Sequence, residues 1–259
     1  MSQKPKPRRF GLARALSKLG YCSRAQASSL IAKGRVRLNG IAARDPEAPV
    51  SIGRDTIEVD GQAIRPAQKT YLMLNKPRGL VTTASDEKGR ETVYSLLPKS
   101  DELRWVAPVG RLDKASEGLL LLTNDSEWGA RVAAPDTHLE KTYHVQIASF
   151  FNQDLLGKLV RGVKTDGEHL RAKRVQLLRT GEKNCWIDIV LDEGKNRQIR
   201  RMLDVLGIEV LRLVRVAIGP LELGKLPKGS YRALTREEKS MLDRAMRARA
   251  TKPRETQPN

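Results

Sequence analysis

One short apolar run, Leu119 to Leu122, constrains the fold of this chain more than any other stretch of its sequence. It is followed by Thr123-Asn124-Asp125, and turn residues on both sides are typical of a strand buried on both faces, not of a helix. The preceding segment, residues 110–118, places Asp113 on the loop that we expect to lead into this strand. A rigid strand with an adaptable loop is a common way to present a reactive side chain.

Three roles compete for Asp113. A turn or cap aspartate needs no further function. A metal ligand needs histidine or carboxylate companions, and nothing nearby in the sequence supplies them. A nucleophile needs a low-dielectric pocket and a cation that keeps the carboxylate ionised. The residues alone leave the turn role and the catalytic role open.

The charge of the chain indicates a polyanionic partner. Its 259 residues are enough for one or two domains with a hydrophobic core. The excess of 48 basic over 30 acidic residues gives a formal charge of +18, which favours nucleic acid first and an anionic membrane surface second. The membrane is the weaker alternative, because no apolar run approaches the roughly 20 residues of a spanning helix. No signal-peptide core follows the start either.

The cysteines and histidines argue against a disulfide framework and against a zinc site. Cys22 and Cys185 lie far apart and belong to no Cys-x-x-Cys pair, and His138, His144 and His169 are scattered. We therefore expect a protein of the reducing cytosol. Residues 1–44 contain no acidic side chain, as in some organellar transit peptides, and this is the alternative location.

Residues 9–65 predict a small module of two short helices followed by a hairpin. The first helical pattern stops at Gly20, and Ser23 is a good N-cap for a second helix that stops at Gly34. Asn39-Gly40 accepts the positive φ angles of a tight type I′ turn between two short strands. Residues 1–8, which mix lysine, arginine and proline, predict a disordered basic leader.

Much of the positive charge belongs to this module. Residues 1–65 carry 13 basic and 5 acidic side chains, so they hold +8 of the total. The basic residues that we expect on the polar sides of the helices and at the hairpin entry are Arg14, Lys18, Arg24, Lys33, Arg35 and Arg37. On these residues alone, a solvated face and a phosphate-binding face are equally good interpretations.

A second domain is predicted for residues 66–246, behind a short polar link at 66–69. Strand and helix patterns mingle there without a regular βαβ alternation, so we expect an α+β fold with a mixed, largely antiparallel sheet. The expected strands are 71–74, 119–123, 141–147, 186–191 and 210–218, and the expected helices are 126–133, 154–160, one that starts within 193–202, and one behind a capping box at 235–238. Residues 247–259 predict an unfolded basic tail.

Several motifs resemble a known family. Residues 110–125, Gly-Arg-Leu-Asp-x-x-Ser-x-Gly-Leu-Leu-Leu-Leu-Thr-Asn-Asp, resemble the signature of ribosomal RNA pseudouridine synthases of the RsuA type. The Lys-x-Tyr strand at 141–143 and Glu-Gly-Lys-x-x-Gln-Ile-Arg-Arg-Met at 193–202 are similar to two further motifs of that family, and Lys-Pro-x-Gly at 76–79 to the opening of its catalytic domain. About residues 9–60, with Ser23-Arg24, Gly34-Arg35-Val36 and Asn39-Gly40, resemble the small RNA-binding domain named after ribosomal protein S-four.

The resemblance implies a catalytic trio of Asp113, Tyr143 and Arg200. In the family the aspartate is the catalytic residue, the arginine pairs with it, and the tyrosine stacks against the target base and can exchange a proton. This combination is physically reasonable, because a dry pocket raises the pKa of a carboxyl group whereas a neighbouring guanidinium lowers it. Arg200 would thus keep Asp113 ionised.

The resemblance also implies RNA contacts. The S-four-like module grips structured RNA through phosphates and shape, which favours the phosphate-binding interpretation of its six basic residues. Arg111 in the Asp113 loop and Arg197 near the start of the helix in the last motif are further expected contacts, since a helix N-terminus with arginines attracts anions. Lys76 is either a phosphate contact or an exposed turn lysine.

The implied function is the isomerisation of uridine to pseudouridine in ribosomal RNA, with large-subunit RNA as the preferred target. The uridine must first leave its stack, which costs a few kcal/mol. The resemblance implies neither cofactor nor metal, and we expect a cytoplasmic monomer without membrane or protein partners. The alternatives are small-subunit ribosomal RNA or transfer RNA as the target, or a non-catalytic RNA-binding or ribosome-assembly factor.

Overall fold

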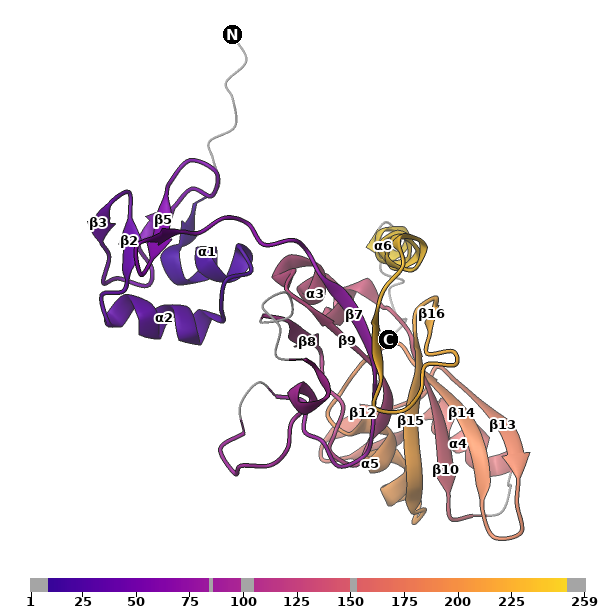
Figure 1. Ribbon diagram of the computed structural model, residues 1–259. Coiled ribbons are helices and arrows are strands. Elements are labelled where there is room, and N and C mark those ends of the chain that lie inside the picture. The colour runs from indigo at the N-terminus through magenta and orange to yellow at the C-terminus, as the bar shows by residue number, and fades with distance from the viewer. Residues whose placement is uncertain (1–8, 84–85, 99–104, 150–152, 251–259) are drawn as a thin grey trace. The chain divides into compact units, whose positions relative to one another are not determined.

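The computed structural model of the chain describes residues 9–83, 86–98, 105–149 and 153–250 (Figure 1). Contacts divide these residues into two compact units. The first unit contains the described residues up to Thr70 together with residues 105–107 and 123–127, and the second unit contains the others. The predicted leader at residues 1–8 and the end of the predicted tail, 251–259, lie outside the described residues.

The first unit begins with the expected helices and hairpin. Helix α1 (Leu12–Lys18) ends before Gly20, and α2 (Arg24–Ala32) begins behind Ser23, whose hydroxyl accepts a 3.0 Å hydrogen bond from the amide of Gln26. The hairpin of β2 (Val36–Leu38) and β3 (Ile41–Ala42) turns at Asn39 and Gly40, which both have positive φ. These features of the sequence prediction are confirmed.

Short strands complete the first unit. A four-stranded sheet has the order β3-β2-β5-β6, with β5 (Ile57–Val59) and β6 (Gln62–Ala63), and β1 (Phe10–Gly11) pairs with β4 (Pro49–Val50). Leucines and alanines of α1 pack with the apolar side chains of α2 and the sheet into one core. The basic side chains of the module are thus left on its outside, apart from Lys18.

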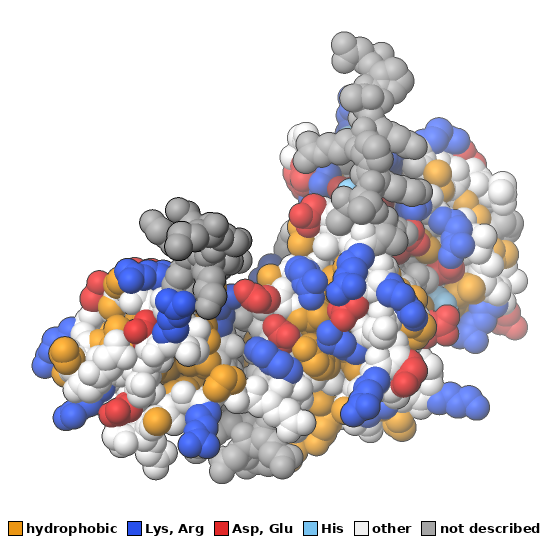
Figure 2. Space-filling model, turned by 90° about the horizontal axis from the view of Figure 1, so that it is seen from above, with side chains coloured by type: hydrophobic (Ala, Val, Ile, Leu, Met, Phe, Trp, Pro, Cys, Tyr) orange, Lys and Arg blue, Asp and Glu red, His pale blue; other side chains and the backbone are white. Residues whose placement is uncertain are grey.

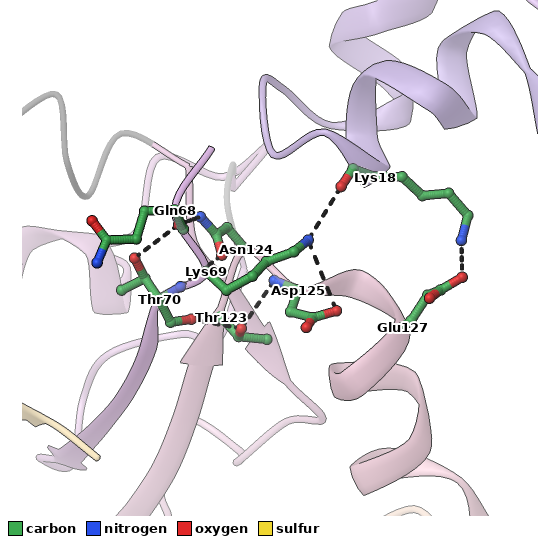
Figure 3. A network of polar contacts seen from close by, with 8 residues as sticks. All are labelled: Lys18, Gln68, Lys69, Thr70, Thr123, Asn124, Asp125 and Glu127. Carbon is green, nitrogen blue, oxygen red and sulfur yellow. Dashed lines mark hydrogen bonds and ion pairs between the residues drawn. The ribbon is translucent and has the colours of Figure 1, made fainter. Parts of the chain in front are cut away.

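Residues 123–127 belong to the first unit because polar contacts tie them to residues 18 and 68–70 (Figure 3). The side chain of Asn124 accepts a 2.9 Å hydrogen bond from the amide of Thr70 and donates a 2.7 Å bond to the carbonyl of Gln68. The hydroxyl of Thr123 donates to the carbonyl of Thr70 at 2.6 Å. The turn that follows the apolar run is therefore fixed on both sides.

The second unit is built on a nine-stranded sheet. The main path has the order β13-β14-β10-β15-β9-β7-β17, with β16 beside β15 and β8 beside β9. The bounds are β7 (Tyr71–Lys76), β8 (Ala107–Val109), β9 (Glu117–Thr123), β10 (Lys141–Ile147), β13 (Arg174–Thr180), β14 (Cys185–Leu191), β15 (Val210–Ile218), β16 (Leu221–Glu222) and β17 (Tyr231–Ala233). Strands β9 and β15 pair in parallel, whereas β13, β14, β10 and β15 pair antiparallel in series. The mixed, largely antiparallel α+β fold is confirmed.

Four helices of the described chain belong wholly or mostly to the second unit: α3 (Ser126–Ala133), α4 (Gln153–Arg161), α5 (Gln198–Val205) and α6 (Arg236–Ala250). The second unit also contains shorter elements. These are a hairpin of β11 (Val163–Thr165) with β12 (Glu168–Leu170), and two 3₁₀ turns at Val93–Leu96 and Pro135–Thr137. Since α6 runs to Ala250, residues 247–250 are helical and not part of an unfolded tail, in keeping with the high helix propensity of alanine and arginine. Over the described ranges, none of the helices combines the length and the apolar character that crossing a membrane requires.

Strand β9 is buried along its whole length, as expected for the apolar run. Its close parallel approach to β15 depends on Gly118, which has a φ of 100° and faces the backbone of Arg215. A Cβ atom at this position would collide with that backbone. Cys22 and Cys185 are both free and buried, one in each unit, so no disulfide joins them.

Candidate active site

One cavity in the second unit collects the three residues of the predicted catalytic trio. It has a volume of about 210 Å³, and its wall includes Asp113, Tyr143 and Arg200. Asp113 comes from the loop between β8 and β9, Tyr143 from β10, and Arg200 from the first turn of α5. Pockets for drug-sized ligands have roughly 300–1,000 Å³, so this cavity suits a single nucleobase better than a longer ligand.

The wall of this pocket is strongly basic. The basic side chains that line it are Arg111, Lys141, Lys195, Arg197, Arg200 and Arg215. Asp113 is the one carboxylate among the described residues of the wall. A surface of this charge attracts the phosphates of RNA. Within the described ranges, no three His, Cys, Asp or Glu side chains are grouped so that they could hold a metal ion.

Lys76 lies inside the protein and not on an exposed turn. Strand β7 runs two residues further than expected, to Lys76, whose side chain is fully buried. Its Nζ donates hydrogen bonds to the carbonyl oxygens of Pro77 at 3.1 Å, Asp113 at 3.1 Å and Ser116 at 2.8 Å. Burial lowers the pKa of Lys76 to about 8. Both predictions for this residue, a phosphate contact and an exposed lysine, are wrong, because internal carbonyls already engage the ammonium group.

The backbone of the Asp113 loop is held at five successive positions. Every carbonyl from residue 112 to residue 116 accepts a hydrogen bond of 2.7 to 3.2 Å. The donors, in order, are Thr82 Oγ1 to Leu112, Lys76 Nζ to Asp113, the Gly79 amide to Lys114, Arg200 Nη2 to Ala115, and Lys76 Nζ to Ser116. The loop thus presents the exposed Asp113 side chain from a fixed frame.

Arg200 contacts the Asp113 loop through its backbone, not through the carboxylate. Its Nη2 donates to the carbonyl of Ala115 at 3.2 Å and its Nη1 to that of Val210 at 3.5 Å, whereas the buried Nε has no partner among the described residues. Burial lowers the pKa of Arg200, as does the charge of Arg197, and the nearby Asp113 carboxylate opposes this shift. Arg200 and Asp113 therefore line the same pocket in this structure, without the ion pair that the resemblance implies.

Tyr143 provides an aromatic ring on the wall of the same pocket. It is half-buried in β10, where it pairs with Ile189 of β14 and Arg215 of β15. Its ring packs partly against the apolar core under α4 and α5. A ring fixed in this way can stack on a flat base, and its phenol can exchange a proton.

The helix of the last motif begins later than the motif does. Helix α5 starts at Gln198, and Arg197 occupies the N-cap position with a φ of 47° and without a side-chain cap. The buried amide of Gln198 donates to Glu193 at 3.1 Å and so fixes the preceding loop. Arg197 itself is exposed at the pocket, where it can reach a phosphate.

The two neighbouring arginines of the motif have different surroundings. Arg200 lines the pocket, whereas Arg201 donates a 2.7 Å hydrogen bond to Glu168 and lies 3.1 Å from a carboxylate oxygen of Asp166. Arg201 thus ties α5 to the hairpin of β11 and β12. Periodicity does not separate these two roles, since both arginines are off the apolar face of the helix.

Five of the six predicted RNA contacts in the first unit are exposed: Arg14, Arg24, Lys33, Arg35 and Arg37. Lys18 is the exception, because its side chain is only 10 % exposed and its ammonium group pairs with Glu127 (Figure 3). The prediction that Lys18 belongs to the exposed basic face is therefore wrong. Arg111, the predicted contact in the Asp113 loop, is exposed in the wall of the pocket.

The exposed arginines are interspersed with acidic residues. Arg35 donates to Asp60 through Nε at 2.8 Å and Nη2 at 2.5 Å, and these hydrogen bonds hold the pKa of Asp60 below its usual range. Figure 2 shows the same mixture, with Lys and Arg side chains spread over the visible face and acidic side chains among them. Arg24, Lys33 and Arg37 have no such partner among the described residues, so they are the best placed for phosphate.

The sequence reasoning did not single out three basic residues of the pocket as site residues, namely Lys141, Lys195 and Arg215. Lys141 is the lysine of the Lys-x-Tyr motif and lies two residues before Tyr143 on the same strand. Arg215 lies in the apolar strand β15 and is 5 % exposed. A signal was present, since arginine is almost never fully buried unless it is paired.

Comparisons with known proteins point to one family. Residues 70–204 match the model of the RNA pseudouridylate synthase family, and residues 11–57 match the S4 domain. An uncharacterized RNA pseudouridine synthase of Aquifex aeolicus is 36% identical over 89% of this chain and 92% of its own length. The ribosomal large subunit pseudouridine synthase B of Bacillus subtilis is 34% identical over 89% of this chain and 94% of its own length.

A solved structure is also similar along nearly the whole chain. The crystal structure of a pseudouridylate synthase matches with a TM-score of 0.64 and 29% identity, covering 90% of this chain and 99% of that one. The chain therefore belongs to the RNA pseudouridylate synthase family. It is an RNA pseudouridine synthase of the RsuA type, an isomerase with an RNA-binding S4 domain.

Proposed function

We propose that this enzyme converts uridine to pseudouridine in ribosomal RNA of the large subunit, with Asp113 as the catalytic carboxylate. The observation that carries the proposal is the pocket itself. Three motifs that are 30 or more residues apart in the chain contribute Asp113, Tyr143 and Arg200 to one small cavity. A carboxylate in a fixed loop, an aromatic ring that can stack on a base and a partly buried cation suit this isomerisation.

The reaction breaks the bond from ribose C1′ to N1 of uracil, and the electron pair of that bond stays on the base. The base then turns, C5 bonds to C1′, and the proton on C5 leaves while N1 gains a proton, so the product is an isomer of the substrate. Asp113 can stabilise or capture the electron-poor C1′ of the sugar, or it can add to the uracil ring before the bond breaks. Its attack on sugar, its attack on the base and its support of elimination are all compatible with this pocket.

Binding of the base supplies the dry surroundings that the free pocket lacks. Asp113 is exposed in the free protein, whereas a flipped base that fills the cavity displaces water from it. The loss of water raises the pKa of a carboxyl group, and the cations of the wall counteract this rise. Arg200, already partly buried and always charged, is the cation that contacts the Asp113 loop directly.

Two relatives support the large subunit as the target. The proteins of Bacillus subtilis and Haemophilus influenzae that resemble this chain, at 34% and 35% identity, are both named ribosomal large subunit pseudouridine synthase B. The exposed arginines and lysine of the first unit, Arg24, Lys33 and Arg37, are suited to the phosphates of a folded RNA. A monomer that works in the cytoplasm without a cofactor stays the prediction made from the sequence.

The chemical proposal is tested by tritium release. Ribosomal RNA labelled with tritium at uridine C5 loses the label when C5 bonds to the sugar, so the wild type should release tritium. Asp113→Asn should release none, whereas Asp204→Asn, which changes an exposed carboxylate on α5, should behave as the wild type. Continued release by Asp113→Asn would remove Asp113 from the mechanism.

The target is tested separately. Pseudouridines of both ribosomal RNAs and of transfer RNA are mapped by chemical labelling and primer extension in a strain that lacks the gene. One missing modification in large-subunit RNA, restored by the wild-type gene and not by Asp113→Asn, is the expected result. A modification missing from small-subunit or transfer RNA instead would contradict the proposed target and leave the chemistry intact.

A further inference from the structure

Arg215 is a buried arginine in the wall of the pocket, and it forms no ion pair with a carboxylate among the described residues. Its side chain is 5 % exposed, and it pairs in register with Tyr143 of β10 and Gly118 of β9. Its Nε donates a 2.8 Å hydrogen bond to the carbonyl of Leu119. Its Nη2 has no hydrogen-bond partner among the described residues. Buried donors in native proteins are nearly always satisfied, so this one calls for an explanation.

A second, partly buried cation lies close to the first. Lys141 lines the same pocket, and its pKa is lowered by burial and then by the positive charge of Arg215, with a smaller opposing effect of Asp192. Neither Lys141 nor Arg215 forms an ion pair with a carboxylate of the described residues. A buried cation beside a partly buried one, with no carboxylate paired to either among the described residues, is unfavourable by itself, which indicates that the ligand supplies negative charge or acceptor atoms.

We propose that Arg215, with Lys141 beside it, donates hydrogen bonds to a carbonyl oxygen of the flipped uracil and stabilises the negative charge of the base while it is detached from the ribose. This inference rests on the proposed reaction, in which the electron pair of the broken bond stays on the base. That charge spreads from N1 to the two carbonyl oxygens. Fixed cationic donors that face such a charge stabilise it most strongly where water is excluded.

Burial favours the base over a phosphate as the partner of Arg215. The exposed cations of the pocket are Arg111 and Arg197, and Asp113 is exposed as well. The backbone phosphates lie on the outside of the RNA strand, so exposed arginines can reach them. A base on a flipped nucleotide is the part of RNA that enters the cavity and reaches a residue that is 5 % exposed.

The test compares Arg215→Met and Arg215→Lys with the wild type. Arg174→Met is the matched control, because Arg174 also lies on a strand of the sheet and pairs with Asp188 but is absent from the pocket wall. The measurements are the single-turnover rate of tritium release at saturating enzyme, the Kd for ribosomal RNA, the dependence of Kd on salt, and the melting temperature. Together they separate chemistry, RNA binding and folding.

The inference predicts a loss in the chemical step alone. Arg215→Met should lower the single-turnover rate about 100-fold or more, as does the loss of a donor from an oxyanion hole. Arg215→Lys should lower it by only about tenfold, since an ammonium group keeps the charge without the planar fork. Both variants should have the same Kd as the wild type and the same dependence of Kd on salt. Arg174→Met should have the wild-type rate. If Arg215→Met does not fold, the rate and Kd of Arg215→Lys decide the question.

Other outcomes overturn it. A weaker Kd with a shallower salt dependence assigns Arg215 to a phosphate, and equal rate losses in the Lys and Met variants, accompanied by lower melting temperatures, assign it to packing. Wild-type rates in both variants leave it without a role in the reaction. Asp113→Asn in the same assay keeps the two proposals apart: its full activity contradicts the proposed function, whereas an inactive Asp113→Asn beside a fully active Arg215→Met contradicts only the role of Arg215.

Discussion

The ammonium group of Lys76 lies 2.8 Å from the carbonyl oxygen of Ser116 and 3.1 Å from that of Asp113, so one buried lysine holds both ends of the turn that carries the proposed catalytic carboxylate. No other described side chain bonds two carbonyls of this loop. Lys76 itself does not face the pocket wall. Its role is therefore to position Asp113, and its loss should affect stability and activity together.

Lys76→Met should destabilise the protein by about 2 kcal/mol or more, because buried carbonyls that lose a donor cost roughly 1–3 kcal/mol each and the methionine offers none. Chemical denaturation of the wild type and the variant measures this difference. Lys164→Met, an exposed lysine on β11, is the control and should change stability little. An equally stable Lys76→Met would show that the loop does not depend on this ammonium group.

The pH dependence of stability should also report on Lys76. Burial lowers its pKa from the ordinary 10.5 to about 8 in the folded protein. Between these two pH values the unfolded chain binds the proton and the folded protein releases it, so this residue makes stability rise with pH in that window. The stability of the wild type relative to Lys76→Met should therefore increase from pH 8 to pH 10.5, as measured by urea denaturation. A constant difference would contradict the lowered pKa.

Much of the fold followed from local patterns. The strand of four leucines, the N-caps at Ser23 and Thr235, and the Asn39-Gly40 turn are local features whose physics does not depend on distant residues. Within the nine-stranded sheet, strands β8, β13, β16 and β17 were not predicted. Strand β13 lies at an edge with mostly exposed side chains, and the other three are short, so their sequences carry little periodicity.

The residues of the pocket wall were predictable where they belong to sequence motifs, and not where tertiary contacts alone bring them there. The motifs placed Asp113, Tyr143 and Arg200, which the structure brings to one pocket. Lys76 was misjudged because the Asp113 and Ser116 carbonyls that its ammonium group contacts lie 37 and 40 residues further along the chain. Arg215 was missed because its neighbours come from β9 and β10, and strand pairing of this kind is not visible in one sequence.

Gly118→Ala should be strongly destabilising. The residue has a φ of 100°, and a Cβ would collide with the backbone of Arg215 on the paired strand, which cannot move without breaking the sheet. We expect a loss of about 2 kcal/mol or more in the free energy of unfolding. Gly194→Ala is the control, because nothing lies within 4 Å of the added Cβ and its φ is not positive. That variant should be as stable as the wild type or slightly more so, since alanine restricts the unfolded chain.

Replacement of Arg24 and Lys33 together by alanine should weaken RNA binding without slowing the chemical step. Both side chains are exposed in the first unit, so each can neutralise one phosphate, and the slope of log Kd against log salt should become shallower by about 2. The rate of tritium release on saturating RNA should stay close to that of the wild type, because neither residue lines the pocket. Lys18→Gln is the matched control from the same unit: its ammonium group already pairs with Glu127, so its effect on the salt slope should be small. An unchanged slope in the double variant would show that this face does not contact phosphates.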